Sequence, residues 1–340
     1  MTLLEVNDLH VVYEGEPDTH AVRGVSFTLE EGENLGLVGE SGCGKTTVAH
    51  AIMQSLPDNG RIVEGEILFD GVDLTKLSKE EIRDLRWEDI SMITQSAMNS
   101  LNPVYRLKDQ IREAIQTHRD VSNDEAYERG RELMELVGIE PDRIEDYPHQ
   151  LSGGMRQRAI IATSLALDPR LILADEPTTA LDVIVQEQIL YRINELQGRI
   201  GNSMMMITHD MSVVAETCDK IVVMYGGEVM EAGTTREVFN NSHHPYTLGM
   251  QNAFPSIEGD AKELISIPGT PPNLSDPPSG CPFSTRCPFE TEECSQPLPV
   301  REISPGHVVR CHEPVPFDTI RENAPKRETW VEVKGGDQWN

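Results

Sequence analysis

Eight consecutive residues near the start of the chain have the types and spacing of a phosphate-binding loop. They match the pattern G-x-x-x-x-G-K-[ST] and comprise Gly39, Glu40, Ser41, Gly42, Cys43, Gly44, Lys45 and Thr46. Glycines let successive backbone N–H groups point at one anion, and a helix that starts at the loop adds its partial positive charge. Lys45 is therefore predicted to reach the outer phosphates of a nucleotide, and the Thr46 hydroxyl to bind Mg²⁺. Thr47 begins the predicted helix and belongs to the same predicted site. The alternative is a glycine-rich turn that carries a lysine by coincidence.

Polar residues also follow other stretches that resemble buried strands. They are Gln95, Asp175, Glu176 and His209. Ligands of open parallel sheets lie beyond the carboxyl ends of the strands, so we predict that these residues share one site with the loop. The alternative is that polar residues end these strands by chance.

The residue types in this predicted site suit the hydrolysis of ATP. Mg²⁺ prefers an octahedron of oxygen ligands and retains several waters. Thr46 and Asp175 offer such oxygens, and Gln95 could supply another. Glu176 is left to polarise a water for in-line attack on the γ-phosphorus, and His209 to orient that water and contact the γ-phosphate.

Four cysteines are gathered near the C-terminus with the spacing C-x5-C-x6-C-x16-C. They are Cys281, Cys287, Cys294 and Cys311, whereas Cys218 stands alone. Such a group favours metal over disulfides in a reducing compartment. The C-x2–4-C pair that is usual in zinc sites is absent, and four thiolates can also hold a [4Fe–4S] cluster. Spacing alone leaves three alternatives open: an iron–sulfur cluster, a zinc ion, and disulfides or free thiols.

The elements that must position these residues alternate between strands and helices. This order predicts an α/β fold with a mostly parallel sheet and helices on both faces. Strands are expected at 3–13, 22–29, 34–38, 65–71, 89–94, 171–176 and 203–208, with a hairpin at 221–231. Helices are expected at 47–56, 74–85, 158–167 and 187–200, and residues 107–138 have helical spacing. Pro and Gly recur from residue 256 onward, so we expect a loop-rich extension that ends in a solvated tail over 323–340.

The charge balance of the chain is strongly acidic. Asp and Glu number 57 against 29 Lys and Arg, which gives a net charge of −28. Such a field repels nucleic acid and anionic lipid. High salt would screen the repulsion among the acidic groups, so we hypothesise a protein adapted to a salt-rich cytoplasm, as in halophilic archaea. The alternative is an acidic protein from an ordinary cytoplasm. No apolar run is long enough to span a bilayer and no signal peptide is evident.

Six motifs, in this order along the chain, resemble those of the nucleotide-binding domain of an ABC transporter. They are residues 39–46, Gln95, 151–154, 171–176, 180–182 and His209. The resemblance implies an ABC-type core with an N-terminal antiparallel β subdomain and a helical subdomain at about 96–165. It also implies that Tyr13 stacks on adenine, although the sequence alone favours a core aromatic at that position. Ser152 and Gly154 would bind the ATP held by a partner subunit, and Asp182 would line the dimer interface.

Further stretches are similar to ATP-binding subunits of oligopeptide/dipeptide importers. They are residues 100–104, 176–183 and 244–247 and the cysteine-rich region. The resemblance implies an ATPase domain over 1–240, a cysteine-rich extension over 241–315 with a [4Fe–4S] cluster, and a tail over 316–340. The implied partners are a second, paralogous ATPase subunit, two transmembrane permease subunits that contact Gln95 and the helical block, and an external substrate-binding protein. No nucleic acid partner is implied, and the expected location is the cytoplasmic face of the cell membrane. The alternatives are an importer of sugars or nickel, and a soluble ABC ATPase that acts on DNA or ribosomes.

Overall fold

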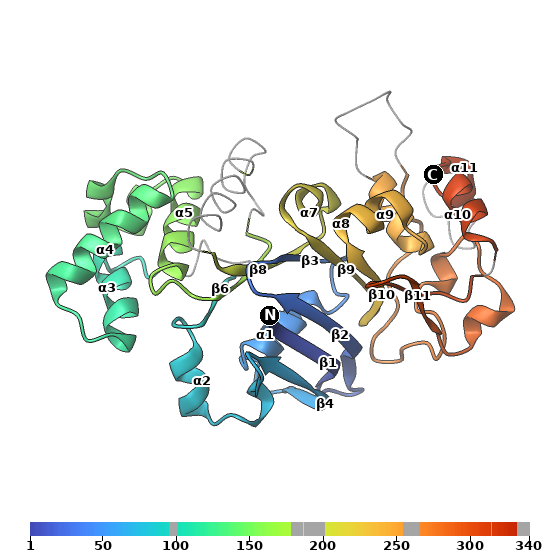
Figure 1. Cartoon of the computed structure of the whole chain (residues 1–340), viewed down its shortest axis with the longest axis horizontal. Coiled ribbons are helices and arrows are strands. Elements are labelled where there is room, and N and C mark those ends of the chain that lie inside the picture. Colours follow the sequence, from blue (N-terminus) through green and yellow to red (C-terminus); the bar gives the residue numbers. More distant parts are fainter. Residues whose placement is uncertain (95–100, 178–185, 187–200, 254–264, 314, 332–340) are drawn as a thin grey trace. The chain divides into compact units, whose positions relative to one another are not determined.

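The computed structural model describes residues 1–94, 101–177, 186, 201–253, 265–313 and 315–331 (Figure 1). It divides into two compact units. One, called the helical unit, comprises residues 1–3, 29–34 and 76–207, and the other, called the loop unit, comprises residues 4–28, 35–75 and 208–340. The predicted phosphate-binding loop and the cysteine-rich extension thus belong to the same unit. The domain boundaries expected at residues 240 and 315 stay a prediction.

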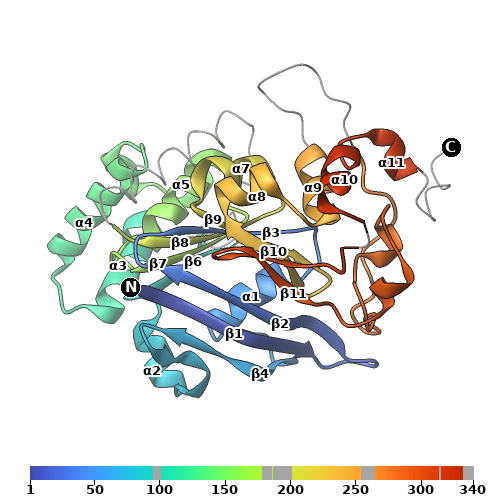
Figure 2. The same cartoon turned by 45° about the vertical axis from the view of Figure 1, so that its right-hand side comes forward.

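The loop unit contains an antiparallel sheet in which the strand order is β2-β1-β4-β5 (Figure 2). The strands are β1 (Thr2–Tyr13), β2 (Thr19–Glu30), β4 (Gly60–Phe69) and β5 (Val72–Asp73). Apolar side chains of β1 and β2 are buried at alternating positions over much of their length, which is the pattern of a sheet with one covered face. The predicted N-terminal antiparallel β subdomain is therefore confirmed.

A second group of paired strands in the loop unit joins the predicted core to the cysteine-rich extension. β3 (Asn34–Val38) runs parallel to β9 (Lys220–Tyr225), and β9 forms the predicted hairpin with β10 (Glu228–Thr234). The extension adds β12 (His307–Arg310) against β10 and β11 (Val300–Ser304) against β12. Strand pairing therefore continues across residue 240, and the extension shares backbone hydrogen bonds with the strands next to the loop.

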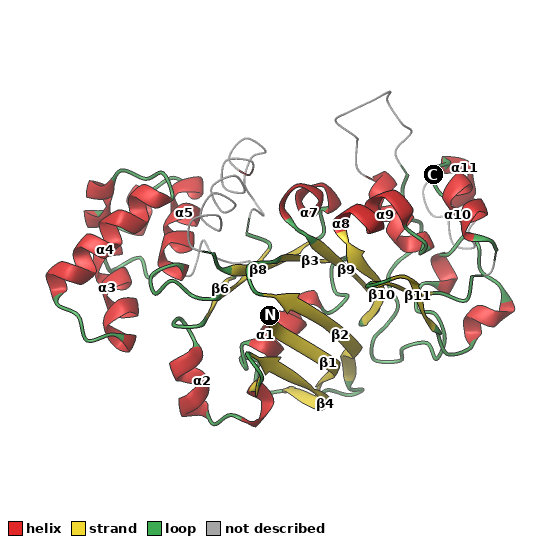
Figure 3. Ribbon diagram, in the orientation of Figure 1, coloured by secondary structure: helices red, strands yellow, loops and turns green. Residues whose placement is uncertain are grey.

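Helices of the loop unit are short, and α9, α10 and α11 lie beyond residue 240 (Figure 3). They are α1 (Lys45–Ile52), α7 (Met211–Thr217), α8 (Thr235–Asn241), α9 (Pro245–Ala253), α10 (Phe317–Asn323) and α11 (Arg327–Val331), with 3₁₀ turns at Ser284–Arg286 and Glu292–Ser295. α1 begins two residues before the start of the predicted helix and ends four residues before its predicted end. It ends early because Gln54 adopts a positive φ of 48°.

The expectation of a solvated tail over 323–340 is wrong for its described part. Trp330 of α11 is only 2% exposed, and its indole N–H donates to the carbonyl oxygen of Ala324 at 2.8 Å. A Cβ at Gly249 of α9 would lie 2.8 Å from the Trp330 ring, which shows how closely the two helices pack. Burial of this aromatic ring anchors the C-terminal helices to the extension.

The helical unit combines a small parallel sheet with a group of helices. β6 (Ile90–Ile93), β7 (Leu171–Asp175) and β8 (Ser203–Thr208) are parallel neighbours in that order. The helices are α2 (Lys79–Leu85), α3 (Leu107–His118), α4 (Asn123–Leu136) and α5 (Gly153–Ser164), with 3₁₀ turns at Pro141–Glu145 and Pro148–Gln150. A further 3₁₀ turn, Leu74–Lys76, lies where the chain passes from the loop unit to the helical unit.

Serine caps explain two differences from the predicted helices of this unit. Residues 74–85 are not one helix, because Ser78 forms a capping box with Glu81 and starts α2. Residues 107–138 are divided in the same way, because Ser122 forms a capping box with Glu125 at the start of α4. The helix expected at 187–200 lies outside the described residues. Among the described residues, none of the helices combines the length and the apolar character needed to cross a bilayer.

We expect Trp330→Ala to lower the free energy of unfolding by about 3 kcal/mol or more, because it empties a buried aromatic site. The measurement is the midpoint of urea unfolding. Val331→Ala is the matched control, since that neighbouring side chain is 67% exposed, and its effect should stay within about 0.5 kcal/mol. Equal midpoints for the two variants would contradict the packing described for α11.

Candidate functional site

The loop between β3 and α1 is held in place by two glycines that no other residue could replace without strain. Gly44 has a φ of 103°, and a Cβ at this position would lie 2.3 Å from the carbonyl oxygen of Ala21 in β2. A Cβ at Gly39 would lie 2.2 Å from the carbonyl oxygen of Met224 in β9. The loop therefore passes between two strands at a distance that only a bare backbone allows.

The start of α1 has the features of an anion site. Its N-cap, Gly44, offers no side chain to the first N–H groups, and no acidic residue lies in the first turn. The N-terminal N–H groups and the helix dipole therefore favour a bound anion. Ser41, Gly42 and Thr46 are exposed on the loop, as the predicted contacts with phosphate and Mg²⁺ require.

Lys45 is 5% exposed, and its ammonium group donates to the loop itself. The Nζ atom lies 2.7 Å from the carbonyl oxygen of Gly39 and 2.9 Å from that of Glu40. Cys43 is 3% exposed, and its sulfur would lie 2.7 Å from a Cβ at Gly39. Burial raises the pKa of its thiol, although the Lys45 charge opposes that shift. The lysine charge is thus held at the base of the loop, and Cys43 has a packing role.

Tyr13 and Thr47 are brought together by the structure. The Tyr13 hydroxyl lies 3.1 Å from Oγ1 of Thr47 in α1. Tyr13 ends β1 opposite Gly60 of β4, and its ring carbon Cε1 would lie 2.8 Å from a Cβ at Gly60. The half-buried ring therefore lies beside the helix that starts at the loop. Stacking of this ring on adenine stays a prediction.

Asp175 and Glu176 lie at the carboxyl end of β7, as predicted, in two different environments. Asp175 is 1% exposed and pairs with Ile207 in the β7–β8 register. Glu176 is half-buried, and its backbone N–H donates to the carbonyl oxygen of Ile207 at 2.9 Å. Glu176 has a φ of 46°, a conformation that costs a non-glycine residue on the order of 1 kcal/mol and is common at functional sites. The backbone therefore turns sharply at the predicted catalytic carboxylate.

Ser152 caps the N-terminus of α5, and its hydroxyl accepts from the backbone N–H of Met155 at 3.3 Å. α5 starts at Gly153, five residues before the prediction, because of this cap. Ser152 is exposed and Gly154 is half-buried. Farther along the helix, the buried Gln157 side chain donates to the carbonyl oxygen of Pro177 at 2.5 Å. α5 is thus tied to the residue that follows Glu176.

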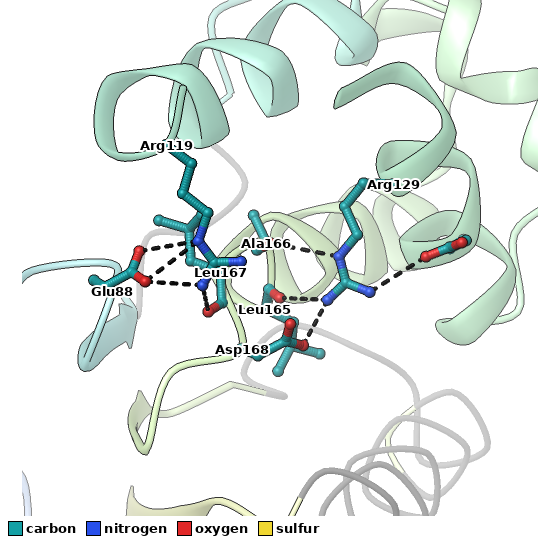
Figure 4. Close-up of polar contacts among 8 residues, drawn as sticks. Glu88, Arg119, Arg129, Leu165, Ala166, Leu167 and Asp168 are labelled. Carbon is teal, nitrogen blue, oxygen red and sulfur yellow. Dashed lines mark hydrogen bonds and ion pairs between the residues drawn. The ribbon is translucent and has the colours of Figure 1, made fainter. Parts of the chain in front are cut away.

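Two arginines hold the opposite end of α5. Figure 4 shows Arg119 and Arg129 directed at carbonyl oxygens of residues 165–167. Arg119 also pairs with Glu88 at 2.9 Å, and Arg129 pairs with Asp168 at 2.5 Å. These carbonyl groups belong to the C-cap, Leu165, and to the two residues after it. Positive side chains near the C-terminus of a helix also complement its dipole. These contacts fix α5 within the helical unit.

The remaining predicted residues are divided between the two units. His209 is exposed directly after β8 and belongs to the loop unit with Lys45 and Thr46, whereas Asp175 and Glu176 belong to the helical unit. Gln95 and Asp182 lie outside the described residues. That the site residues of the loop unit and those of the helical unit bind one nucleotide therefore stays a prediction.

The four clustered cysteines are buried or nearly so, and none forms a disulfide. The Glu313 N–H lies 3.4 Å from the Cys311 sulfur, and N–H groups of Phe283 and Phe289 bond the sulfurs of Cys281 and Cys287. Each donor is two residues after its cysteine. Burial raises the pKa of Cys281 to about 12 and that of Cys311 to about 11. A cation bound among these thiols would favour their ionised form and oppose the effect of burial.

A buried carboxylate that the sequence analysis missed anchors the extension. Glu231 of β10 is 0% exposed and accepts from the Ser242 hydroxyl, the His243 N–H and the His307 ring at 2.7, 2.8 and 2.9 Å. Burial alone would raise the pKa of Glu231, but these hydrogen bonds outweigh it and lower the pKa. Within the described residues, Glu231, His243 and His307 form the one group whose ligand atoms all lie within 4.8 Å of one another. Because hydrogen bonds already occupy both carboxylate oxygens, the group joins β10 to β12 as a structural contact.

A second missed residue is Arg286, which lies between Cys281 and Cys287 and pairs with Glu40 of the loop at 2.6 Å. An arginine in a proline-rich segment gives no periodic signal, and a contact over 246 residues leaves no local trace in the sequence.

Two family models match parts of this chain. A model described as ABC transporter matches residues 22–179, and one described as the C-terminal region of oligopeptide/dipeptide transporters matches residues 230–294. The class of protein is thus defined: the chain is an ATP-binding protein of the ABC transporter family. Within this class, it belongs to the ATP-binding proteins of the oligopeptide/dipeptide transport type, as similarity over nearly its whole length shows.

Relatives and solved structures give the extent of the similarity. The oligopeptide transport ATP-binding protein OppD of Salmonella typhimurium is 46% identical over 317 residues, which are 92% of this chain and 94% of that protein. The dipeptide transport ATP-binding protein DppD of Lactococcus lactis is 45% identical over 98% of both chains. A dimeric post-hydrolysis structure of the ATP-binding cassette MJ0796 with ADP and Pi is 28% identical, with a TM-score of 0.63, and covers 68% of this chain and 99% of that one.

Proposed function

We propose that this chain is the ATP-hydrolysing subunit of an importer of oligopeptides or dipeptides. The observation that carries the proposal is the phosphate-binding loop at the uncapped start of α1, with Lys45 held at its base. The names of the relatives, which refer to oligopeptide and dipeptide transport, support peptides over sugars or nickel as the substrate.

In the proposed reaction, the loop N–H groups and Lys45 bind the β- and γ-phosphates. Thr46, Asp175 and Gln95 bind Mg²⁺, and Tyr13 stacks on adenine. Glu176 polarises the attacking water, which His209 orients, so that catalysis rests on positioning and charge neutralisation. Ser152, Gly154 and Asp182 act across a dimer interface on the ATP of the second subunit. The dimeric state of the MJ0796 cassette supports this arrangement.

The proposed membrane partners are two permease subunits, together with an external substrate-binding protein and a paralogous ATPase. A hollow of about 620 Å³ in the helical unit, lined in part by Thr94, supports a docking site for a permease segment. It is lined by Trp87, Met92, Leu101, Tyr105 and Ile160, among others. Tyr105 and Val104 beside it are 54% and 71% exposed, as expected of an apolar surface that a partner covers. The subunit would then lie on the cytoplasmic face of the cell membrane.

The four clustered cysteines are proposed to hold a [4Fe–4S] cluster. The C-x2–4-C pair that is usual in zinc sites is absent from this region of the sequence, which favours the cluster over a zinc ion. The N–H···S hydrogen bonds described above suit thiolates that bind iron. The cluster would serve as a covalent link among loops that bury little apolar surface.

Adaptation to a salt-rich cytoplasm is proposed from the charge of the chain. The net charge is −28, and the basic residues comprise 21 Arg and only 8 Lys. Repulsion among surface carboxylates opposes folding at low ionic strength.

We expect Glu176→Gln to bind ATP as the parent does. Its rate of hydrolysis should be lower by a factor of about a hundred or more, because the base for the attacking water is lost. Both proteins are purified from detergent-solubilised membranes through a tag, and nucleotide binding and phosphate release are measured. Glu135→Gln is the control, because it removes an exposed carboxylate on α4. This variant should bind and hydrolyse ATP as the parent does.

The same preparations test the transporter assignment. Recovery of two polytopic membrane proteins with the tagged chain is expected. Parental hydrolysis by Glu176→Gln would refute the role of Glu176. Recovery of ribosomes or DNA in place of membrane proteins would favour a soluble ATPase.

The anaerobically purified chain is expected to be brown and to contain about four irons per chain, in line with a [4Fe–4S] cluster. Cys294→Ser should lose most of the iron, because it removes one ligand. Cys218→Ala is the control, since this cysteine lies outside the group. Colourless protein with one zinc per chain would refute the cluster.

Added KCl should raise the melting temperature. The Debye length falls from about 10 Å at 0.1 M salt to about 3 Å at 1 M, which screens the surface carboxylates. Thermal unfolding is followed by circular dichroism across this range, with sucrose as the control for solute effects other than screening. A melting temperature that is flat or falls with KCl would reject the salt adaptation.

A further inference from the structure

The Arg286 side chain is fixed by all five of its N–H donors. Its Nη1 and Nη2 atoms donate to the two carboxylate oxygens of Glu40 at 2.6 and 3.0 Å. The other donors reach the Tyr225 hydroxyl at 3.0 Å and the carbonyl oxygens of residues 267 and 268 at 3.3 and 2.7 Å. The side chain is 6% exposed. A planar, two-point pair of this kind sets the orientation of both partners.

Glu40, the second residue of the phosphate-binding loop, is held at each of its polar groups. Its carboxylate accepts from Arg286, its backbone N–H donates to the Tyr246 hydroxyl at 2.8 Å, and its carbonyl oxygen accepts from Lys45 at 2.9 Å. Tyr246 and Arg286 both come from residues beyond 240. The G-x-x-x-x-G-K-[ST] pattern accepts any residue at this position, so binding of phosphate by the loop does not by itself require a glutamate.

The groups that hold Glu40 lie on a packed aromatic support. Rings of Tyr225, Tyr246 and Phe283 lie with centroids 4.7 to 5.2 Å apart, and the Arg286 guanidinium lies 5.6 Å from the Tyr225 ring centroid. A Cβ at Gly226, next to Tyr225, would lie 2.7 Å from Pro282. Such close packing leaves the Arg286 side chain little freedom to move away from the loop.

We propose that Arg286 is a positioning residue of the nucleotide site, which sets the conformation of the phosphate-binding loop through Glu40. The cysteine-rich extension is then a part of the nucleotide site. A loop that is already ordered binds its ligand without the entropy cost of ordering, so the contact strengthens ATP binding while the chemical groups act elsewhere. The inference rests on the proposed ATP binding.

A double-mutant cycle tests the inference. Arg286→Met keeps the length of the side chain but removes its charge and donors, and Glu40→Gln weakens the same pair from the loop side. Titration of the full chain with Mg²⁺ and a fluorescent ATP analogue should give dissociation constants roughly tenfold higher for each variant, or about 1.4 kcal/mol. The double variant should be no weaker than the worse single variant, because both changes remove one interaction.

Steady-state hydrolysis by the complex with its partner subunits separates positioning from a general loss of structure. KM for ATP should rise in both single variants, while kcat at saturating ATP stays within about twofold of the parent. Arg301→Met is the matched control. Arg301 also lies in the extension, but its guanidinium donates to Glu313 and to the carbonyl oxygen of His312 and to no residue of the loop. This variant should therefore bind ATP like the parent.

Parental affinity in both single variants would overturn the proposal, and so would additive effects in the double variant. If Arg286→Met does not fold, as judged by its melting transition, the affinity of Glu40→Gln decides alone. Failure of the parent itself to bind the analogue would instead refute the proposed function.

Discussion

The conformation of the phosphate-binding loop depends on one chain of charged contacts, from Arg286 through Glu40 to Lys45. The guanidinium fixes the Glu40 carboxylate, and the Glu40 carbonyl oxygen accepts from the Lys45 ammonium group. Glycines 39 and 44 let the backbone pass between β2 and β9, but they also make it free to adopt other conformations. Contacts from the C-terminal extension restrict that freedom, which gives a physical reason for the extension to be paired with the strands next to the loop.

In the helical unit, a different set of contacts serves a comparable purpose. Glu176 has a strained backbone at the end of β7, and the residue after it accepts a hydrogen bond from Gln157 of α5. The exposed N-terminal end of α5 carries Ser152, and arginine side chains hold its C-terminal end. The Gln157 hydrogen bond therefore links α5 to the backbone beside Glu176. The proposed action of Ser152 on a nucleotide of the second subunit is consistent with such a connection.

Local signals in the sequence account for the elements that were predicted well. β3 and β8 have the predicted bounds because every residue of β8, and all but one of β3, is buried in a short apolar run. The loop motif was evident because glycine, lysine and threonine occur at fixed offsets. α5 starts before the predicted residue, because Ser152 and the glycines after it are residue types that are typical of loops. In the structure, Ser152 caps the helix and Gly153 is its first residue.

Contacts between distant residues account for what the sequence did not predict. Burial of Trp330 depends on its packing against α9, and the short polar segment around it has the composition of a solvated tail. Glu231 looks like any acidic residue of a hairpin, although it is fully buried among groups from β12 and the turn before α9. The pair of Arg286 and Glu40 spans 246 residues. Pairing of this kind follows from the three-dimensional packing of strands and loops, and no periodicity within a segment encodes it.

An experimental structure of the chain with Mg²⁺ and ATP tests this account most directly. The account predicts the triphosphate at the start of α1, with Lys45 on the phosphates and the pair of Arg286 and Glu40 intact. A nucleotide bound elsewhere, or a loop that binds ATP only after Glu40 has separated from Arg286, would contradict it.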